Sequence, residues 1–155
     1  MSESLASAAT LRGVMIQISG SQLLLPNAAI AEVLSLVETE PVEDAPDWLL
    51  GKIRWHGWQV PLIAFSQLAQ TGAPSGTLRG QRVLILKALG GNPRMPYMAI
   101  LAQGFPRLIT VPETLEDLGA AGEDIPAFKV RYLDEEAMIP DLEQMEILLQ
   151  EVLGG

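Results

Sequence analysis

The clearest signal for the fold lies in residues 45–63, which read APDWLLGKIRWHGWQVPLI. Two apolar arms flank the dipeptide His56-Gly57, and such a dipeptide makes a two-residue hairpin turn because glycine accepts a positive φ. Residues that pair across an antiparallel hairpin share one face of it. The register set by this turn predicts three core-facing pairs, namely Trp55 with Trp58, Ile53 with Val60, and Gly51 with Leu62.

The opposite face of this hairpin is polar. There the same register pairs Arg54 with Gln59 and Lys52 with Pro61, so two cations lie on one face. An ordinary solvated face accounts for them, and so does a docking surface that recognises the carboxylates of a partner protein. Because Pro61 has no N–H for a ladder, its strand is predicted to be an edge strand or to begin a bend.

The rest of the chain is divided by 14 glycine and 11 proline residues into short runs rich in Val, Ile and Leu. This pattern is typical of a compact, mainly β domain. Besides the hairpin, strands are predicted at residues 13–19, 22–25, 82–86, 97–102, 107–111, 128–132 and 137–139. Asn27 is expected to cap a helical turn over residues 28–33.

A C-terminal helix is predicted to begin at Asp141, with Gln144 at the capping-box position. Its apolar stripe, interpreted as core packing, consists of Leu142, Met145, Leu148, Leu149 and Val152. The acidic residues 134–136 are expected to form a solvated hairpin tip, since nothing near them in the sequence would tune their pKa values. The acidic segment 38–46 is likewise interpreted as a surface loop.

Composition excludes several classes of function. The 155 residues include 10 Lys and Arg and 19 Asp and Glu, giving a formal net charge of −9, which disfavours binding to nucleic acid or anionic lipid. Cysteine is absent and histidine occurs once, which disfavours thiolate or histidine metal sites and triad catalysis. We therefore expect no cofactor, no metal and no enzymatic activity.

The domain organisation is predicted to be simple. Residues 1–10 are expected to form a disordered tail, and residues 11–152 a single domain with a flexible connection near residues 70–80. The start of the chain does not resemble a signal peptide and no apolar run is long enough to span a membrane, so we expect a cytoplasmic protein without membrane insertion. About five short strands on each side of the connection suit two small barrels.

The segment 45–63 resembles the signature region of CheW-like domains. That family has a Pro-containing turn, an apolar triplet followed by Gly, a hairpin with the tip Asn-Leu-Arg-Gly, and a strand ending in Val-Pro and two apolar residues. Ile30-Ala31-Glu32-Val33 is similar to the family's Val-x-Glu-Ile segment, and residues 137–142 are similar to its closing strand. The resemblance covers roughly residues 11–152.

The resemblance implies a mainly β fold, with two intertwined five-stranded SH3-like barrels, short helices and a C-terminal helix. It also implies a non-catalytic adaptor of bacterial chemotaxis-type signal transduction. Such adaptors bind the cytoplasmic tip of a methyl-accepting chemoreceptor and the regulatory domain of a CheA-type histidine kinase. Gly51, Gly57 and Pro61 match the family's structural positions at the hairpin.

The polar positions of the signature differ from the family pattern. Arg54 stands where the family usually has Asn, His56 stands where it has the tip Arg, and Ala64 replaces a frequent Asp. These differences suggest a divergent member, similar to the ChpC-like proteins of type IV pilus systems that control twitching motility. Partner contacts are predicted at Ile30, Val33, Lys52, Arg54, His56 and Trp58.

Two other hypotheses remain at this stage. The acidic excess and an apolar barrel interior would also suit a small-molecule-binding barrel, or a hydrolase that uses surface carboxylates, although no nucleophile and base pair is present. Alternatively, the chain is a regulatory subunit that self-associates through the face of Lys52 and Arg54. Ligand-induced shifts in melting temperature would favour the first, and a concentration-dependent dimer the second.

Overall fold

The computed structural model describes residues 12–35, 38–72, 81–88, 90, 93–111 and 115–153. Its elements, in chain order, are β1 (Arg12–Ile18), β2 (Ser21–Pro26), the short 3-10 helix η1 (Asn27–Ala29), β3 (Ile30–Leu34), β4 (Leu49–Trp55), β5 (Trp58–Ile63), α2 (Phe65–Leu68), β6 (Gln81–Lys87), β7 (Tyr97–Thr110), β8 (Glu116–Ala120), β9 (Ala127–Tyr132), β10 (Glu135–Pro140) and α3 (Leu142–Leu153). The predicted N-terminal tail and most of the predicted flexible connection lie outside the described residues.

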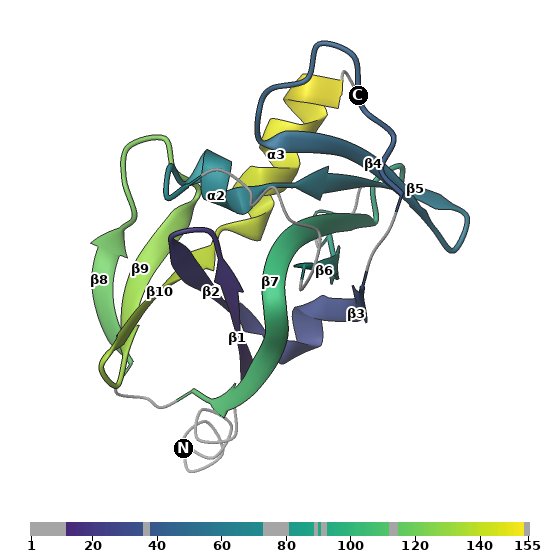
Figure 1. The fold of residues 1–155 in the computed structure, drawn as a ribbon. Coiled ribbons are helices and arrows are strands. Elements are labelled where there is room, and N and C mark those ends of the chain that lie inside the picture. Colours follow the sequence, from purple (N-terminus) through teal and green to yellow (C-terminus); the bar gives the residue numbers. More distant parts are fainter. Residues whose placement is uncertain are drawn as a thin grey trace.

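The strands form one 10-stranded sheet in the order β3-β6-β7-β1-β2-β10-β9-β8, and β5 joins it by pairing with both β4 and β7. Figure 1 shows β7 as a long curved strand. It pairs with β6 and β5 near its start and with β1 along its second half. The strong curvature separates two lobes: the hairpin lobe (β3, β4, β5, β6) and the terminal lobe (β1, β2, β8, β9, β10), with β7 common to both.

Three apolar clusters fill this arrangement. The largest lies between the lobes and includes Phe65 of α2 and Met145 and Leu149 of α3, so both helices pack against it. A second cluster, around Ile53 and Ile85, fills the hairpin lobe. A third and smaller one, around Met15, Leu24, Val130 and Ala137, fills the terminal lobe. Each lobe therefore has its own interior, and α2 and α3 close the seam between the lobes.

The mainly β architecture with a C-terminal helix confirms the predicted fold class. The β4–β5 register is the predicted one at every pair named above. The N–H of Gln144 donates to the Asp141 carboxylate over 3.1 Å, as expected at the start of α3. Among the described strands, however, the hydrogen-bonded path ends at β3 and β8 and does not close into two complete barrels.

Some predicted elements need correction. The helical turn expected over residues 28–33 is the 3-10 turn Asn27–Ala29, without a side-chain cap, and residues 30–34 form strand β3 instead. The runs 97–102 and 107–111 are parts of the single strand β7. Gly104, with φ of 69°, lies in a bulge where the register with β1 shifts, so the chain bends at the Gly-Phe-Pro sequence without leaving the sheet.

Strand β8 was not predicted from the sequence. It reads EDLGA, a composition with low β propensity, and it forms by pairing with β9 at the end of the sheet. No helix in the described part of the chain is long and apolar enough to span a membrane.

Candidate functional site

The tip of the β4–β5 hairpin brings aromatic side chains to the surface of the hairpin lobe. His56 and Gly57 form the turn with φ values of 49° and 81°, and Trp55 pairs directly with Trp58. Trp55 is half-buried against the hairpin-lobe core, whereas Trp58 is 41 % exposed. The predicted core filling thus holds for Trp55, but it is wrong for Trp58, whose ring remains accessible.

Glu32 of strand β3 reaches the same tip. Its Oε1 accepts the indole N–H of Trp55 at 2.8 Å and lies 3.6 Å from Nε2 of His56. The rings of Trp55 and His56 are in edge contact, with centroids 4.4 Å apart. The carboxylate thus fixes the indole of Trp55 and lies close to the ring of His56.

Tyr97, the first residue of β7, completes this aromatic group. Its ring makes edge contacts with Trp55, at 4.8 Å between centroids, and with Trp58, at 6.3 Å. Val33 of β3 is 38 % exposed on the same lobe. It follows Glu32 directly in the strand and therefore lies on the opposite face of β3. We call the group formed by Glu32, Trp55, His56, Trp58 and Tyr97 the hairpin surface.

The predicted contact residues do not all lie on this surface. His56 and Trp58 belong to it. Val33 lies on the other face of β3, and Ile30 is half-buried and packs against the large core cluster. Lys52 and Arg54 alternate with Ile53 and Trp55 along β4, and therefore lie on the reverse face of the hairpin. Arg54 is exposed there, while Lys52 is half-buried.

The structural positions of the hairpin have clear physical roles. Gly51 has φ of 146°, and any Cβ at this position would collide with the carbonyl oxygen of Glu40. The backbone N–H and C=O of Lys52 both bond to Glu40, each over 2.8 Å. The Lys52–Pro61 pair therefore needs no ladder bond, and β5 can accept a proline at this position. The prediction of an edge strand here is wrong, because β5 pairs with β4 on one side and, from Leu62 onward, with β7 on the other.

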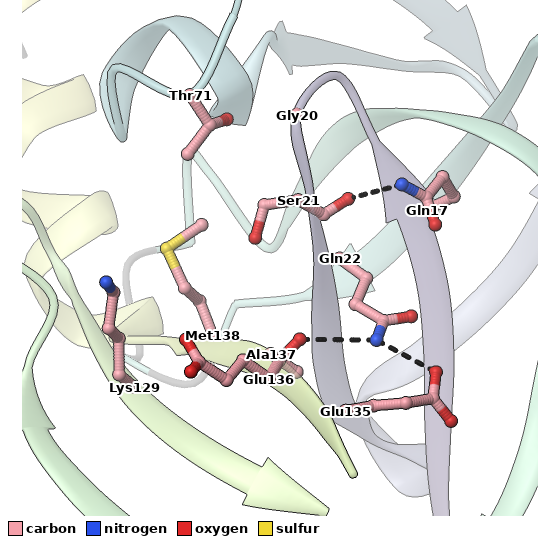
Figure 2. A pocket seen from close by; sticks show the side chains of 10 residues that line it. All are labelled: Gln17, Gly20, Ser21, Gln22, Thr71, Lys129, Glu135, Glu136, Ala137 and Met138. Atoms are coloured by element: carbon pink, nitrogen blue, oxygen red, sulfur yellow. Dashed lines mark hydrogen bonds between the residues drawn. The ribbon is translucent and has the colours of Figure 1, made fainter.

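A second candidate site lies on the terminal lobe, where β2 and β10 diverge. The two strands pair in parallel at a single position, Leu23 with Met138. Beside it opens a cleft of about 440 Å³, which we call the β2–β10 cleft. Its lining consists of Gln17, Gly20, Ser21, Gln22, Thr71, Lys129, Glu135, Glu136, Ala137 and Met138 (Figure 2).

Glu135 is fixed at one end of this cleft. Its carboxylate accepts hydrogen bonds from the side chain of Gln22, at 3.1 Å, and from the Arg107 guanidinium, at 3.0 and 3.1 Å. The Gln22 bond, followed by the bond and charge of Arg107, lowers the pKa of Glu135 below its ordinary value. The predicted bounds of the tip, residues 134–136, are wrong, because the turn is Leu133–Asp134 and Glu135 already belongs to β10, although its side chain stays partly exposed.

Sequence reasoning missed Tyr97, Gln22, Lys129 and Arg107. Each comes from a strand distant in sequence from the groups it joins, so no local motif indicates it. Glu32 was recognised only as part of a similar segment and not as a contact residue. Among the described residues, no group of three or more His, Cys, Asp or Glu side chains is arranged to hold a metal ion.

Comparisons with known proteins agree with this architecture. The model of one protein family, described as the CheW-like domain, matches residues 12–145. A similar solved structure is the scaffolding protein TtCheW from Thermoanaerobacter tengcongensis, with a TM-score of 0.70 and 16 % sequence identity over 84 % of this chain and 84 % of that chain. At this identity the likeness concerns the fold alone. A search of curated proteins gives no match.

Proposed function

Because this chain belongs to the CheW-like domain family, we propose that it is a non-catalytic adaptor that couples chemoreceptors to a CheA-type histidine kinase. A chemotaxis-type scaffold or coupling role follows from the family. The family match over residues 12–145 is the observation that carries the proposal. The identity of the two partners and the absence of catalysis are our proposal and do not follow from the family match.

The partners proposed are the regulatory domain of the kinase and the cytoplasmic tip of a methyl-accepting receptor. Both partners are reached in the cytoplasm, which is the location we propose for the chain. The predicted domain, residues 11–152, would then act as one binding unit. The signature of this domain keeps Gly51, Gly57 and Pro61, but Arg54 and His56 stand in place of the usual Asn and Arg. These differences favour a divergent system, such as the ChpC-like one that controls twitching by type IV pili.

The hairpin surface supports a binding role for the hairpin tip. Trp58 presents a large apolar ring beside Tyr97, and tryptophan and tyrosine are the residue types most often found at energetic hot spots of interfaces. Glu32 and His56 add polar groups at the rim of the same surface. We propose that one of the two partners binds here, and that Arg54 extends the contact on the reverse face of the hairpin.

Binding assays with the full chain test the proposal. The purified kinase regulatory domain and a receptor signalling-tip fragment are titrated separately by calorimetry, then together to detect a ternary complex. Trp58→Ala is expected to weaken one of the two interactions by about 2 kcal/mol, because it removes an accessible aromatic anchor. Ile147→Ala is the matched control, since Ile147 on α3 is exposed to a similar degree, at 43 %.

Two outcomes would overturn the proposal. The chain would not be the proposed coupling protein if neither partner bound the wild-type chain at high concentration. The hairpin surface would not be the contact if Trp58→Ala and Ile147→Ala had equal effects. Kinase and receptor fragments from flagellar and pilus systems, compared side by side, identify the pathway.

A further inference from the structure

The turn of the β9–β10 hairpin combines two features that work against folding. Tyr132 pairs with Glu135, so the turn consists of Leu133 and Asp134 alone. Leu133 has φ of 57°, in the left-handed region, and its side chain is 74 % exposed. A bulky L-residue avoids this backbone conformation, and an exposed leucine gains nothing from apolar burial. Neither packing nor backbone preference therefore accounts for a leucine here.

The other two-residue hairpin turns in the described part of the chain each contain a glycine with a positive φ. Gly20 has φ of 77° in the β1–β2 turn, and Gly57 has φ of 81° in the β4–β5 turn. Glycine, asparagine and aspartate are the usual residues at such positions. The β9–β10 turn has Leu133 there instead. An exposed residue in a strained conformation indicates a contact outside the chain.

Contacts from neighbouring strands hold this turn in one position. Directly after it, the Glu135 carboxylate accepts hydrogen bonds from Gln22 of β2, at 3.1 Å, and from Arg107 of β7, at 3.0 and 3.1 Å. Directly before it, Tyr132 is half-buried against the apolar cluster of the terminal lobe. Leu133 is therefore presented on a fixed support, and binding at this residue costs little conformational entropy.

Carboxylates outnumber cations around the turn. Among the described residues of β8, β9, β10 and the turn, the carboxylates are those of Glu116, Asp117, Asp134, Glu135 and Glu136. With Arg107 of β7 included, the cations are Arg107, Lys129 and Arg131. Glu116 and Glu136 share Arg131, at 3.1 and 3.4 Å, and Asp134 has no ion pair in the described part of the chain. The charge beside Leu133 is therefore negative and attracts cations.

We propose that the β9–β10 turn docks against an apolar surface of a partner protein that is flanked by lysine or arginine side chains. Leu133 is the apolar anchor, and Asp134 and Glu136 pair with the cations of the partner. A second copy of this chain fits less well, because two chains of net charge −9 repel each other. In Figure 1 the β9–β10 turn and the tip of β4–β5 lie on opposite sides of the molecule. The contact is thus separate from the hairpin surface and does not depend on the coupling role.

A synthetic peptide serves as the probe of this chemistry. It is a capped helical peptide with one stripe of leucines flanked by lysines, so that it presents an apolar strip between cations. The full chain, labelled with 15N, is titrated with this peptide. Amide shifts are expected at Leu133, Asp134 and Glu136, and not at Gly57 or Trp58. Two matched peptides carry glutamate in place of lysine, or serine in place of leucine, and neither is expected to bind.

The variant Leu133→Asn separates a binding role from a structural one. Asparagine accepts a positive φ more readily than leucine, so the variant is expected to melt about 2–4 °C above wild type. It is also expected to bind the leucine and lysine peptide about tenfold more weakly, because the apolar anchor is lost. Ile147→Ala, which shortens an exposed apolar side chain on α3, is the control and should leave the affinity unchanged.

The variant Asp134→Asn tests the charge at the turn. It is expected to weaken binding of the peptide about two- to threefold at low salt, and the difference should disappear at high salt because exposed charges are screened. Glu123→Gln, at an exposed residue of the loop before β9, removes the same charge at the other end of the hairpin. It is the control and should have a smaller effect.

Several results would contradict the proposal. Unchanged affinity in Leu133→Asn, or equal binding of the serine or glutamate peptide, would remove the apolar anchor or the role of charge. A lower melting temperature in Leu133→Asn would make Leu133 a structural residue. Shifts at the turn that depend on protein concentration without peptide would assign it to self-association, and no shift at saturating peptide would exclude a site there. The peptide contains no kinase or receptor sequence, so failure of this proposal and failure of the coupling role are separate results.

Discussion

The indole N–H of Trp55 donates to the carboxylate of Glu32, with 2.8 Å between Nε1 and Oε1, and joins the tip of the β4–β5 hairpin to strand β3. β3 lies at one end of the described strand order and pairs only with β6 there. No backbone ladder joins the β4–β5 tip to β3, and the side-chain hydrogen bond between Trp55 and Glu32 connects the two instead. This contact sets the position of Trp55 and, through ring packing, of His56 and Tyr97.

The first prediction concerns this contact. Glu32→Ala and Trp55→Phe are each expected to lower the free energy of unfolding by about 1 kcal/mol, because each removes one hydrogen bond to a charged group. The double variant should lose less than the sum of the two, since both remove the same bond. Urea denaturation measures all three, and strictly additive losses would show that the bond is not formed in solution.

The second prediction concerns Arg54. Arg54→Glu is expected to weaken partner binding while leaving the melting temperature nearly unchanged, because an exposed strand charge contributes little to folding. Calorimetric titration and thermal unfolding of the same sample check both halves of the statement. Lys87→Glu is the control for the change in net charge. A large loss of stability in Arg54→Glu alone would mean that Arg54 is structural.

The third prediction separates two reasons for glycine in the hairpin. At Gly57 a side chain meets nothing within 4 Å, so Gly57→Ala suffers only from the positive φ, a cost of about 1 kcal/mol. Gly57→Val should cost more, because a β-branched residue resists this conformation. Gly51→Ala should be the most damaging, since its Cβ would also strike the backbone of Glu40. Equal melting temperatures for Gly51→Ala and Gly57→Ala would contradict this order.

The fourth prediction concerns acid stability. Because the pKa of Glu135 lies below its ordinary value of 4.5 in the folded state, its ionised form stabilises the fold above that value, and this contribution is lost as the pH falls through the lowered pKa. Glu135→Gln is therefore expected to be less stable than wild type at neutral pH and to approach it in acid. Urea denaturation over this pH range measures the difference. Glu123→Gln, at an exposed loop residue, is the control for the loss of one carboxylate.

The sequence predicts the elements whose pattern is local. The β4–β5 register follows from a two-residue turn and strict alternation, and the start of α3 follows from Asp141. Strand β8 could not be predicted in this way, because EDLGA has no intrinsic preference for a strand and depends on β9 for its conformation. The continuity of β7 was missed for a related reason, since Gly104 and Pro106 indicate a break that the bulge against β1 absorbs.

The candidate sites likewise contain some residues that are close in sequence and others that only the fold brings together. His56 and Trp58 could be found because they are adjacent in the hairpin turn. Tyr97 reaches Trp58 only through the pairing of β5 with β7, and Gln22 meets Glu135 across 113 positions of sequence. The divergence of β2 and β10 depends on the folded sheet as a whole. It therefore cannot be predicted from a local sequence pattern.

The position of β7 has a consequence for synthesis on the ribosome. β1 and β5 are made early, yet both find a pairing partner in β7, which ends only at Thr110. Neither lobe of the nascent chain can complete its sheet before β7, which ends at Thr110, has left the exit tunnel. Until then its apolar strands lack their pairing partners and stay exposed. A translation product that stopped before β7 would therefore not fold into one stable lobe, and chaperones and proteases would act on it.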